Sequence, residues 1–172
     1  MKKIMIMILI ISSLFLFGCG KEKNSDNNKE LNNITYTNKF ECSREETLTK
    51  DQIYYATKEE PTTEGKGDAV NVTYTRSYDF DKKGENLLAY YDITTYEYIL
   101  DYDMDKQKAY YENNCKEVDK DTYKSCKVTL NNKKIIIITE TDLTSSVAKE
   151  YLATVSLADV KENYAETPYT CK

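Results

Sequence analysis

The chain has 172 residues, with 24 Lys and Arg against 29 Asp and Glu, a formal net charge of −5 at pH 7 and no histidine. The lack of histidine removes the Ser–His and Cys–His catalytic arrangements and a common zinc ligand. An acidic chain repels phosphate backbones, and no basic run with interleaved aromatic residues occurs. Nucleic-acid binding is therefore not expected.

The N-terminus has the layout of an export signal. Lys2 and Lys3 precede an apolar run over residues 4–17 that is broken only by two serines. A membrane-spanning helix needs about 20 apolar residues, and this run is shorter. We therefore expect residues 1–18 to be a cleaved signal peptide.

The segment Leu16-Phe17-Gly18-Cys19 resembles the lipobox of bacterial lipoproteins. The resemblance implies diacylglycerol on the Cys19 sulfur and cleavage between Gly18 and Cys19. Two acyl chains are enough for stable anchoring, so we expect the mature protein to be anchored through Cys19 to the extracytoplasmic face of a cell membrane. The alternative is an ordinary secretory signal in which the cysteine occurs by chance.

The rest of the chain divides into a tether and one domain. Residues 19–39 combine the lipidated cysteine with an Asn- and Lys-rich stretch that has too few apolar residues to fold, so we expect a flexible tether. Residues 40–172 have the size of a single domain. Removal of Lys2 and Lys3 changes the formal charge from −5 to −7.

Four cysteines remain in the domain, and an even number in an extracytoplasmic protein favours disulfides. Three pairings are possible. We favour one bond that ties the two ends of the domain and a second that closes a short loop. Close cysteine pairs of the CxxC type are absent, so structural zinc is not expected. The favoured bonds are Cys42 with Cys171 and Cys115 with Cys126.

The first hairpin is predicted over residues 70–96. Apolar and aromatic residues alternate with polar ones over 70–80, which indicates a half-buried strand. Turn residues follow over 81–86, and β-branched and aromatic residues resume over 87–96.

A helix is predicted from about Ile99, because the period changes to intervals of three and four. Its stripe contains one polar residue, Lys108. The other members are Leu100, Met104, Tyr111, Cys115 and Val118.

A second hairpin and two short helices are predicted next. Strands over 122–130 and 134–141 flank an Asn-rich turn, and Ile135 to Ile138 are expected to form a central strand buried on both faces. Helices are expected over 145–152 and 157–164, the latter opened by a capping box of Ser156 and Asp159. An extended tail over 169–172 closes the chain.

These elements predict an α+β domain with a mainly antiparallel sheet of two or more hairpins and helices packed on one face. Residues 43–56 are expected to add one or two strands, and residues 58–68 form a polar loop.

The lipobox, the tether, Phe40-Glu41-Cys42 and the final Tyr169-Thr170-Cys171-Lys172 after a short helix together resemble the YehR-like small lipoproteins. The resemblance implies a small α+β lipoprotein whose early and late cysteines are candidates for pairing. Cys115 and Cys126 are not part of that pattern.

Four carboxylates have the spacing of oxygen ligands in an EF-hand loop: Asp101, Asp103, Asp105 and Glu112. Lys106 occupies the position where such a loop needs glycine. A helix with a solvated acidic first turn, favoured by the helix dipole, explains the same residues, so calcium stays the weaker hypothesis and no cofactor is expected.

The chain has 16 tyrosines, and Tyr90, Tyr96 and Tyr98 fall on one face of a predicted strand with Leu88. This face either binds an aromatic or polar ligand or packs half-buried in the core.

These patterns favour a non-catalytic, lipid-anchored domain that binds an envelope protein or another ligand. The alternative is an envelope hydrolase using paired carboxylates, which predicts a cleft where carboxylates of perturbed pKa converge.

Overall fold

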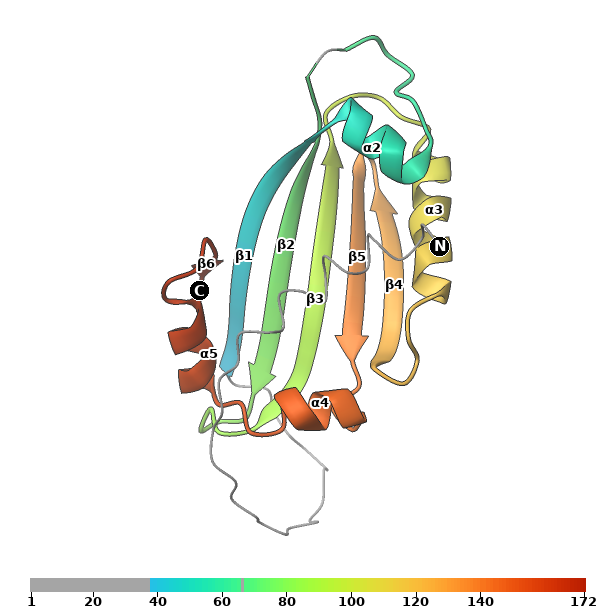
Figure 1. Cartoon of the computed structure of the whole chain (residues 1–172). Coiled ribbons are helices and arrows are strands. Elements are labelled where there is room, and N and C mark those ends of the chain that lie inside the picture. Colours follow the sequence, from blue (N-terminus) through green and yellow to red (C-terminus); the bar gives the residue numbers. More distant parts are fainter. Residues whose placement is uncertain (1–37, 66) are drawn as a thin grey trace. The chain divides into compact units, whose positions relative to one another are not determined.

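The computed structural model describes residues 38–65 and 67–172. The predicted signal peptide, Gly18, Cys19 and the tether up to residue 37 lie outside the described residues. The described strands are β1 (Asn38–Thr49), β2 (Asp68–Phe80), β3 (Leu87–Tyr98), β4 (Tyr123–Asn131), β5 (Lys134–Thr141) and β6 (Thr170–Cys171), and the described helices are α2 (Lys50–Thr57), α3 (Met104–Lys116), α4 (Ser146–Tyr151) and α5 (Leu157–Tyr164) (Figure 1).

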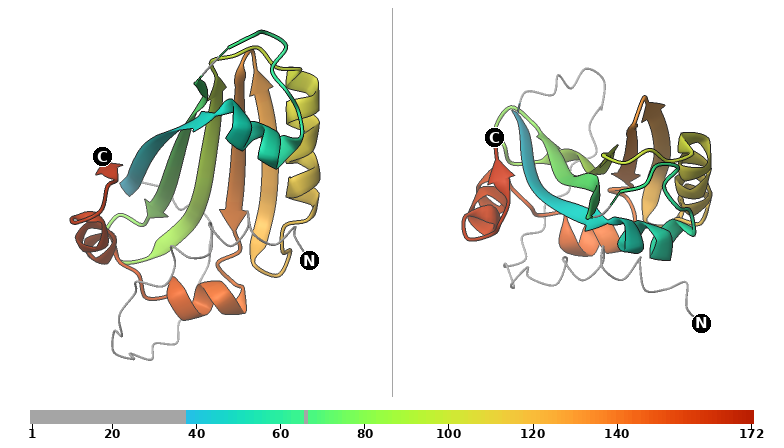
Figure 2. Two further views of the ribbon diagram at one scale, coloured as in Figure 1. Left: turned by 45° about the horizontal axis from the view of Figure 1, so that its top comes forward. Right: turned by 90° about the horizontal axis from the view of Figure 1, so that it is seen from above.

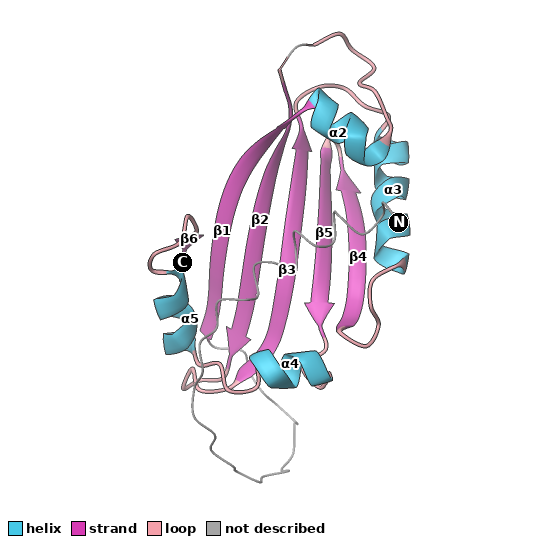
Figure 3. Ribbon diagram, viewed as in Figure 1, coloured by secondary structure: helices cyan, strands magenta, loops and turns pink. Residues whose placement is uncertain are grey.

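The strands form one six-stranded sheet in the order β4-β5-β3-β2-β1-β6, and every neighbouring pair is antiparallel. The two predicted hairpins, β2–β3 and β4–β5, are both present, and β5 pairs with β3 to join them. Figure 3 shows the helices distributed around the margins of this sheet. The predicted α+β class with a mainly antiparallel sheet is confirmed.

One face of the sheet carries the core. Strand side chains alternate between faces, so the register places Phe40 beside Tyr78 and Ile135 beside Tyr96 on the same face. Helix residues join strand residues of this face in two apolar clusters, which confirms the prediction that the helices pack on one face (Figure 2). We call it the helix-bearing face.

The two clusters occupy opposite ends of that face, and we name each after one helix. The α5 cluster contains Phe40, Cys42, Tyr78, Phe80, Tyr90, Ala148, Leu152, Val155, Val160 and Tyr164. The α3 cluster contains Ile53, Ala69, Val70, Val72, Tyr98, Tyr102, Tyr111 and Ile135.

The expectation of strands throughout residues 43–56 is wrong in its second half. The chain leaves β1 at Thr49 and turns into α2 through a capping box, in which the Thr49 backbone N–H donates to Gln52 Oε1 at 2.8 Å. Ile53 and Thr57, one helical turn apart, are the buried residues of α2. At its other end β1 includes Asn38 and Lys39, so the predicted tether up to residue 39 is two residues too long.

Helix α3 begins later than predicted, at Met104. Asp103 caps it by accepting a hydrogen bond from the Lys106 backbone N–H at 3.2 Å. Ile99 instead extends the β3 region, because its N–H donates to the Ala69 carbonyl at 2.8 Å. Gln107 is the buried polar residue of the helix, one position before the Lys108 that the stripe had included.

Strand β5 is buried less evenly than expected. Ile135 is fully buried on the helix-bearing face, whereas Ile136 to Ile138 are half-buried. Ile136 and Ile138 point to the opposite face, which carries no described helix, so they keep part of their surface in solvent. Ile137 lies on the helix-bearing face and packs against the α3 cluster. The β2–β3 pairing also shifts register near its turn, so that Leu87 rather than Leu88 packs against the α5 cluster.

Candidate functional site

The centre of the helix-bearing face is polar, although both of its ends are apolar. Arg76 and Asp92 are cross-strand partners on β2 and β3, and Arg76 Nε lies 3.6 Å from Asp92 Oδ1. Their side chains are 16% and 31% exposed. The Tyr90 hydroxyl donates to the same carboxylate oxygen at 2.8 Å. We define the Arg76 cluster as Arg44, Tyr74, Arg76, Tyr78, Tyr90, Asp92, Tyr164 and Tyr169.

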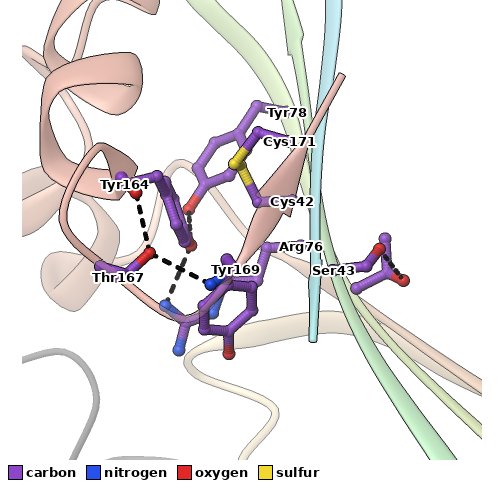
Figure 4. The surroundings of a disulfide bond; sticks show 9 residues. Cys42, Ser43, Arg76, Tyr78, Tyr164, Thr167, Tyr169 and Cys171 are labelled. Carbon is purple, nitrogen blue, oxygen red and sulfur yellow. Dashed lines mark hydrogen bonds between the residues drawn. A yellow bond between two sulfur atoms is a disulfide. The ribbon is translucent and has the colours of Figure 1, made fainter. Parts of the chain in front are cut away.

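Helix α5 brings one tyrosine of this cluster to the sheet. Arg76 Nη1 donates to the Tyr164 hydroxyl at 3.1 Å, and the hydroxyls of Tyr78 and Tyr164 are also 3.1 Å apart (Figure 4). The helix is set in place by its capping box of Ser156 and Asp159 and by the buried Val160. Tyr164 therefore links the apolar α5 cluster to the polar centre.

The C-terminal segment contributes Tyr169. The disulfide between Cys42 and Cys171 fixes this segment to β1, and Glu41 and Lys172 exchange backbone hydrogen bonds of 3.0 and 2.9 Å. The ring of Tyr169 then meets the ring of Tyr164 edge to face, with 5.2 Å between centroids.

Two guanidinium groups flank that ring. Arg44 and Arg76 lie 5.8 and 5.6 Å from the centroid of Tyr169. Arg44 also lies 4.7 Å over the ring of Tyr74. An arginine held on an aromatic face keeps its N–H donors directed outward from the ring edge, which suits binding of a hydrogen-bond acceptor.

Three tyrosines of the cluster, Tyr74, Tyr78 and Tyr90, are hydrogen-bond donors and not bases. Burial raises the pKa of Tyr74, Tyr78 and Tyr90 above the ordinary value, so all three hydroxyls stay protonated at neutral pH. Burial also raises the pKa of Asp92, an effect that the neighbouring Arg76 opposes. These three protonated hydroxyls can position a polar ligand but cannot abstract a proton from it.

The four carboxylates considered for calcium do not form a loop. Helix α3 occupies most of the segment, Asp103 serves as its N-cap, Asp101 forms an ion pair with Lys133, and Glu112 pairs with a lysine one turn earlier in α3. Asp105 lies exposed in the first turn. Over residues 38–65 and 67–172 there is no group of three or more His, Cys, Asp or Glu that could hold a metal ion.

The favoured cysteine pairing is confirmed. Cys42 is bonded to Cys171, and Cys115 is bonded to Cys126 with 5.4 Å between their Cα atoms. The second bond ties the end of α3 to β4, an edge strand, and the register through Thr139 and Asp92 places Cys126 on the same face of the sheet as Arg76.

The tyrosines that the sequence placed on one face do share it, but they divide between two roles. Tyr90 belongs to the Arg76 cluster. Tyr96 stacks on Tyr111 with 4.6 Å between centroids, and the Tyr98 hydroxyl donates to the buried Gln107 at 2.8 Å. Tyr96 and Tyr98 are therefore part of the core of the α3 end.

Sequence reasoning missed Arg76, Asp92, Tyr164 and Tyr169. Arg76 carried a usable signal, because it occupies an inward position of an alternating strand between Tyr74 and Tyr78. A charged residue at such a position needs a partner. Nothing local in the sequence indicated that the partner would be Asp92 or that α5 would reach it.

A hollow of about 120 Å³ lies beside α4. No charged side chain lines it, so it lacks the carboxylates that a hydrolase needs. Its lining residues are Asn86, Leu87, Leu143, Ala148, Leu152 and Ala153.

Comparison of the chain with protein-family models, with curated proteins and with solved structures found no match. In the described part of the chain, no helix is both long enough and apolar enough to cross a bilayer.

Proposed function

We propose that the mature protein is a lipid-anchored, extracytoplasmic domain that binds a polar ligand or an envelope protein, without catalysis, through the Arg76 cluster. The observation that carries this proposal is the position of the cluster. It separates the two apolar clusters of the helix-bearing face with a half-buried ion pair, two arginines and three protonated tyrosines.

Stability alone does not account for such a centre. A buried ion pair recovers little more free energy than well-packed apolar residues of the same volume, because both charges lose their hydration. A row of apolar side chains would join the two clusters at lower cost. Exposed Arg44, held on Tyr74 beside Tyr169, instead presents donors to whatever approaches the face.

The anchoring part of the proposal rests on Cys19 and its lipobox. The two disulfides support it, because such bonds persist in oxidising, extracytoplasmic compartments. Mass spectrometry of the protein purified from native membranes should find a mature chain that begins at an acylated Cys19, with the other four cysteines protected from alkylation until reduction. An unmodified Cys19 would contradict the anchor without affecting the binding surface.

We extend the proposal to kinship with the YehR-like lipoproteins. Its support is that the two short motifs of that resemblance, around Cys42 and Cys171, lie side by side and are covalently joined. A hydrolase is the second candidate, because burial raises the pKa of Asp92 as expected for a general acid. Asp92 interacts with Arg76 and Tyr90, however, and this arrangement favours binding.

The binding surface is tested by photocrosslinking in the native cell, with p-benzoylphenylalanine in place of Tyr169. The matched control replaces Tyr151, an exposed tyrosine of α4 outside the cluster. We expect a discrete adduct from position 169 that is lost when Arg44→Ala is added, and no such adduct from position 151. Equal adducts from both positions, or an adduct indifferent to Arg44→Ala, would reject the Arg76 cluster as the binding surface.

A further inference from the structure

Strand β1 is paired along only part of its outer edge. On its inner side it pairs with β2 from Asn38 to Thr49. On its outer side β6 covers only Cys42 and Ser43, with one further pair of hydrogen bonds between Glu41 and Lys172. Figure 1 shows α5 beside the N-terminal part of β1 and no described element beside the stretch of β1 between β6 and α2.

The direction of the backbone groups follows from that pairing. Glu41 exchanges both hydrogen bonds with Lys172, so its N–H and C=O point outward. In an antiparallel strand, alternate residues point the same way, which directs the backbone groups of Glu45 and Thr47 outward as well. The next residue of this row, Thr49, donates its N–H to Gln52. Glu45 and Thr47 therefore offer backbone donors and acceptors that no described strand takes up.

The row that β6 begins can be continued by another strand. Tyr169, which precedes β6 in the chain, lies against Arg44, so the open edge of β1 begins after Arg44. Further along β1 towards its C-terminal end, a new strand would meet the side chains of Glu45 and Glu46, and then that of Leu48. Opposite charges on neighbouring strands attract, and a half-buried leucine favours an apolar neighbour.

We propose that the edge of β1 from Glu45 to Leu48 binds an extended, cationic segment of a partner polypeptide by strand addition. The segment runs antiparallel to β1, continues the row of β6, and carries an apolar residue opposite Leu48 and basic residues opposite Glu45 and Glu46. Main-chain hydrogen bonds provide the contact, and the two carboxylates select the charge.

A second copy of this chain fits the edge less well. If two β1 edges paired antiparallel about Glu46, that carboxylate would face its own copy, and like charges directly opposite are destabilising. Pairing about Glu45 would bring Thr47 of the second copy opposite Ser43, where Thr170 already lies.

The test uses the full-length lipoprotein in detergent and two fluorescent peptides, Ac-Thr-Val-Thr-Lys-Lys-Thr-amide and its Glu-Glu counterpart. We expect saturable binding of the Lys-Lys peptide in fluorescence anisotropy. Thr47→Pro removes an outward N–H without touching the β1–β2 ladder and should weaken binding about tenfold or more. Thr47→Val keeps the N–H and the β-branched shape, so it should bind like the wild type.

The charge component has its own pair of variants. Glu45→Lys should weaken binding of the Lys-Lys peptide about tenfold, whereas Glu162→Lys on the exposed side of α5 makes the same charge change and should have no effect. Intact disulfides and an unchanged circular dichroism spectrum verify the fold of each variant. Failure of the wild type to bind, equal binding of both peptides, or equal binding by Thr47→Pro and Thr47→Val would overturn the proposal. Self-association that Thr47→Pro abolishes would replace the partner with a second copy.

Discussion

The two ends of the helix-bearing face are assembled by different routes. At the α3 end, helix α2 directly follows β1, α3 directly follows β3, and the disulfide joins cysteines only 11 positions apart. At the α5 end, β1 is closed by the C-terminal segment, and the disulfide spans 129 positions. One end is therefore built from chain neighbours, and the other depends on bringing the two termini of the domain together.

The two ends also differ in how they treat buried polar groups. At the α3 end Gln107 is fully buried and bonded to Tyr98 and Thr57, so its polar atoms serve the core. At the α5 end the polar groups gather at the border, where Arg76 and Asp92 remain partly accessible. The comparison indicates that polar groups are enclosed in the core at one end and remain partly accessible to solvent at the other.

Removal of the long-range disulfide should have the largest effect. By the loop-entropy relation, Cys42→Ala/Cys171→Ala should lower the free energy of unfolding by about 5 kcal/mol, and Cys115→Ala/Cys126→Ala by about 3 kcal/mol. Chemical denaturation of both double variants measures the difference. Equal losses of unfolding free energy would show that the α5 end does not depend on the disulfide between Cys42 and Cys171.

The ion pair separates a structural from a binding role. Arg76→Met alone should lower the free energy of unfolding by about 2–3 kcal/mol, because it leaves the Asp92 carboxylate half-buried without its cation. Arg76→Met/Asp92→Leu should regain most of that loss and still fail to form the adduct at position 169. A double variant as unstable as the single one would mean that the pair is required for the fold.

At the α3 end, Gln107→Leu should cost about 1–2 kcal/mol, because it leaves the Tyr98 hydroxyl buried without an acceptor. Adding Tyr98→Phe removes that hydroxyl and should restore most of the stability. Thermal unfolding of the two single variants and the double variant provides the coupling free energy. If the losses of unfolding free energy in the two single variants simply added up in the double variant, Gln107 and Tyr98 would not be coupled by a hydrogen bond.

The smallest expected effect concerns the capping boxes of α5 and α2, which differ in the residue that accepts the hydrogen bonds. Hydrogen bonds from the Ser156 side chain and backbone lower the pKa of Asp159 below its ordinary 3.8. Its stabilisation of α5 is therefore present above that pH and is lost as the pH falls through the lowered pKa. Asp159→Ala should cost about 0.5–1 kcal/mol near pH 6, and less at a pH below 3.8, where the wild-type carboxylate begins to protonate.

The corresponding position in α2 is Gln52, which does not titrate. Gln52→Ala should therefore have the same small cost at both pH values. Unfolding free energies of both variants and the wild type, measured by denaturant titration at each pH, test this difference. A pH-dependent effect of Gln52→Ala would show that the loss at low pH arises elsewhere.

Local sequence patterns identified most helices and strands, because the formation of each element depends mainly on residues close together in the chain. Alternation located β2 and β3, and the Ser156–Asp159 spacing located the start of α5. The same reasoning failed at α2, where Thr49 and Gln52 formed a cap inside a stretch treated as strand. It also failed near Leu88, because a register shift is decided by pairing with the neighbouring strand.

The sequence by itself determined the α+β class and both hairpins, since these follow from periodicity and turn residues. It favoured one of three cysteine pairings, and the structure decided among them. Only the tertiary structure decided the strand order, the meeting of Arg76 with Asp92 and Tyr164, and the open edge of β1. The register between strands and the docking of α5 depend on contacts between residues far apart in the chain. A pattern that repeats every two or three to four residues carries no record of those contacts.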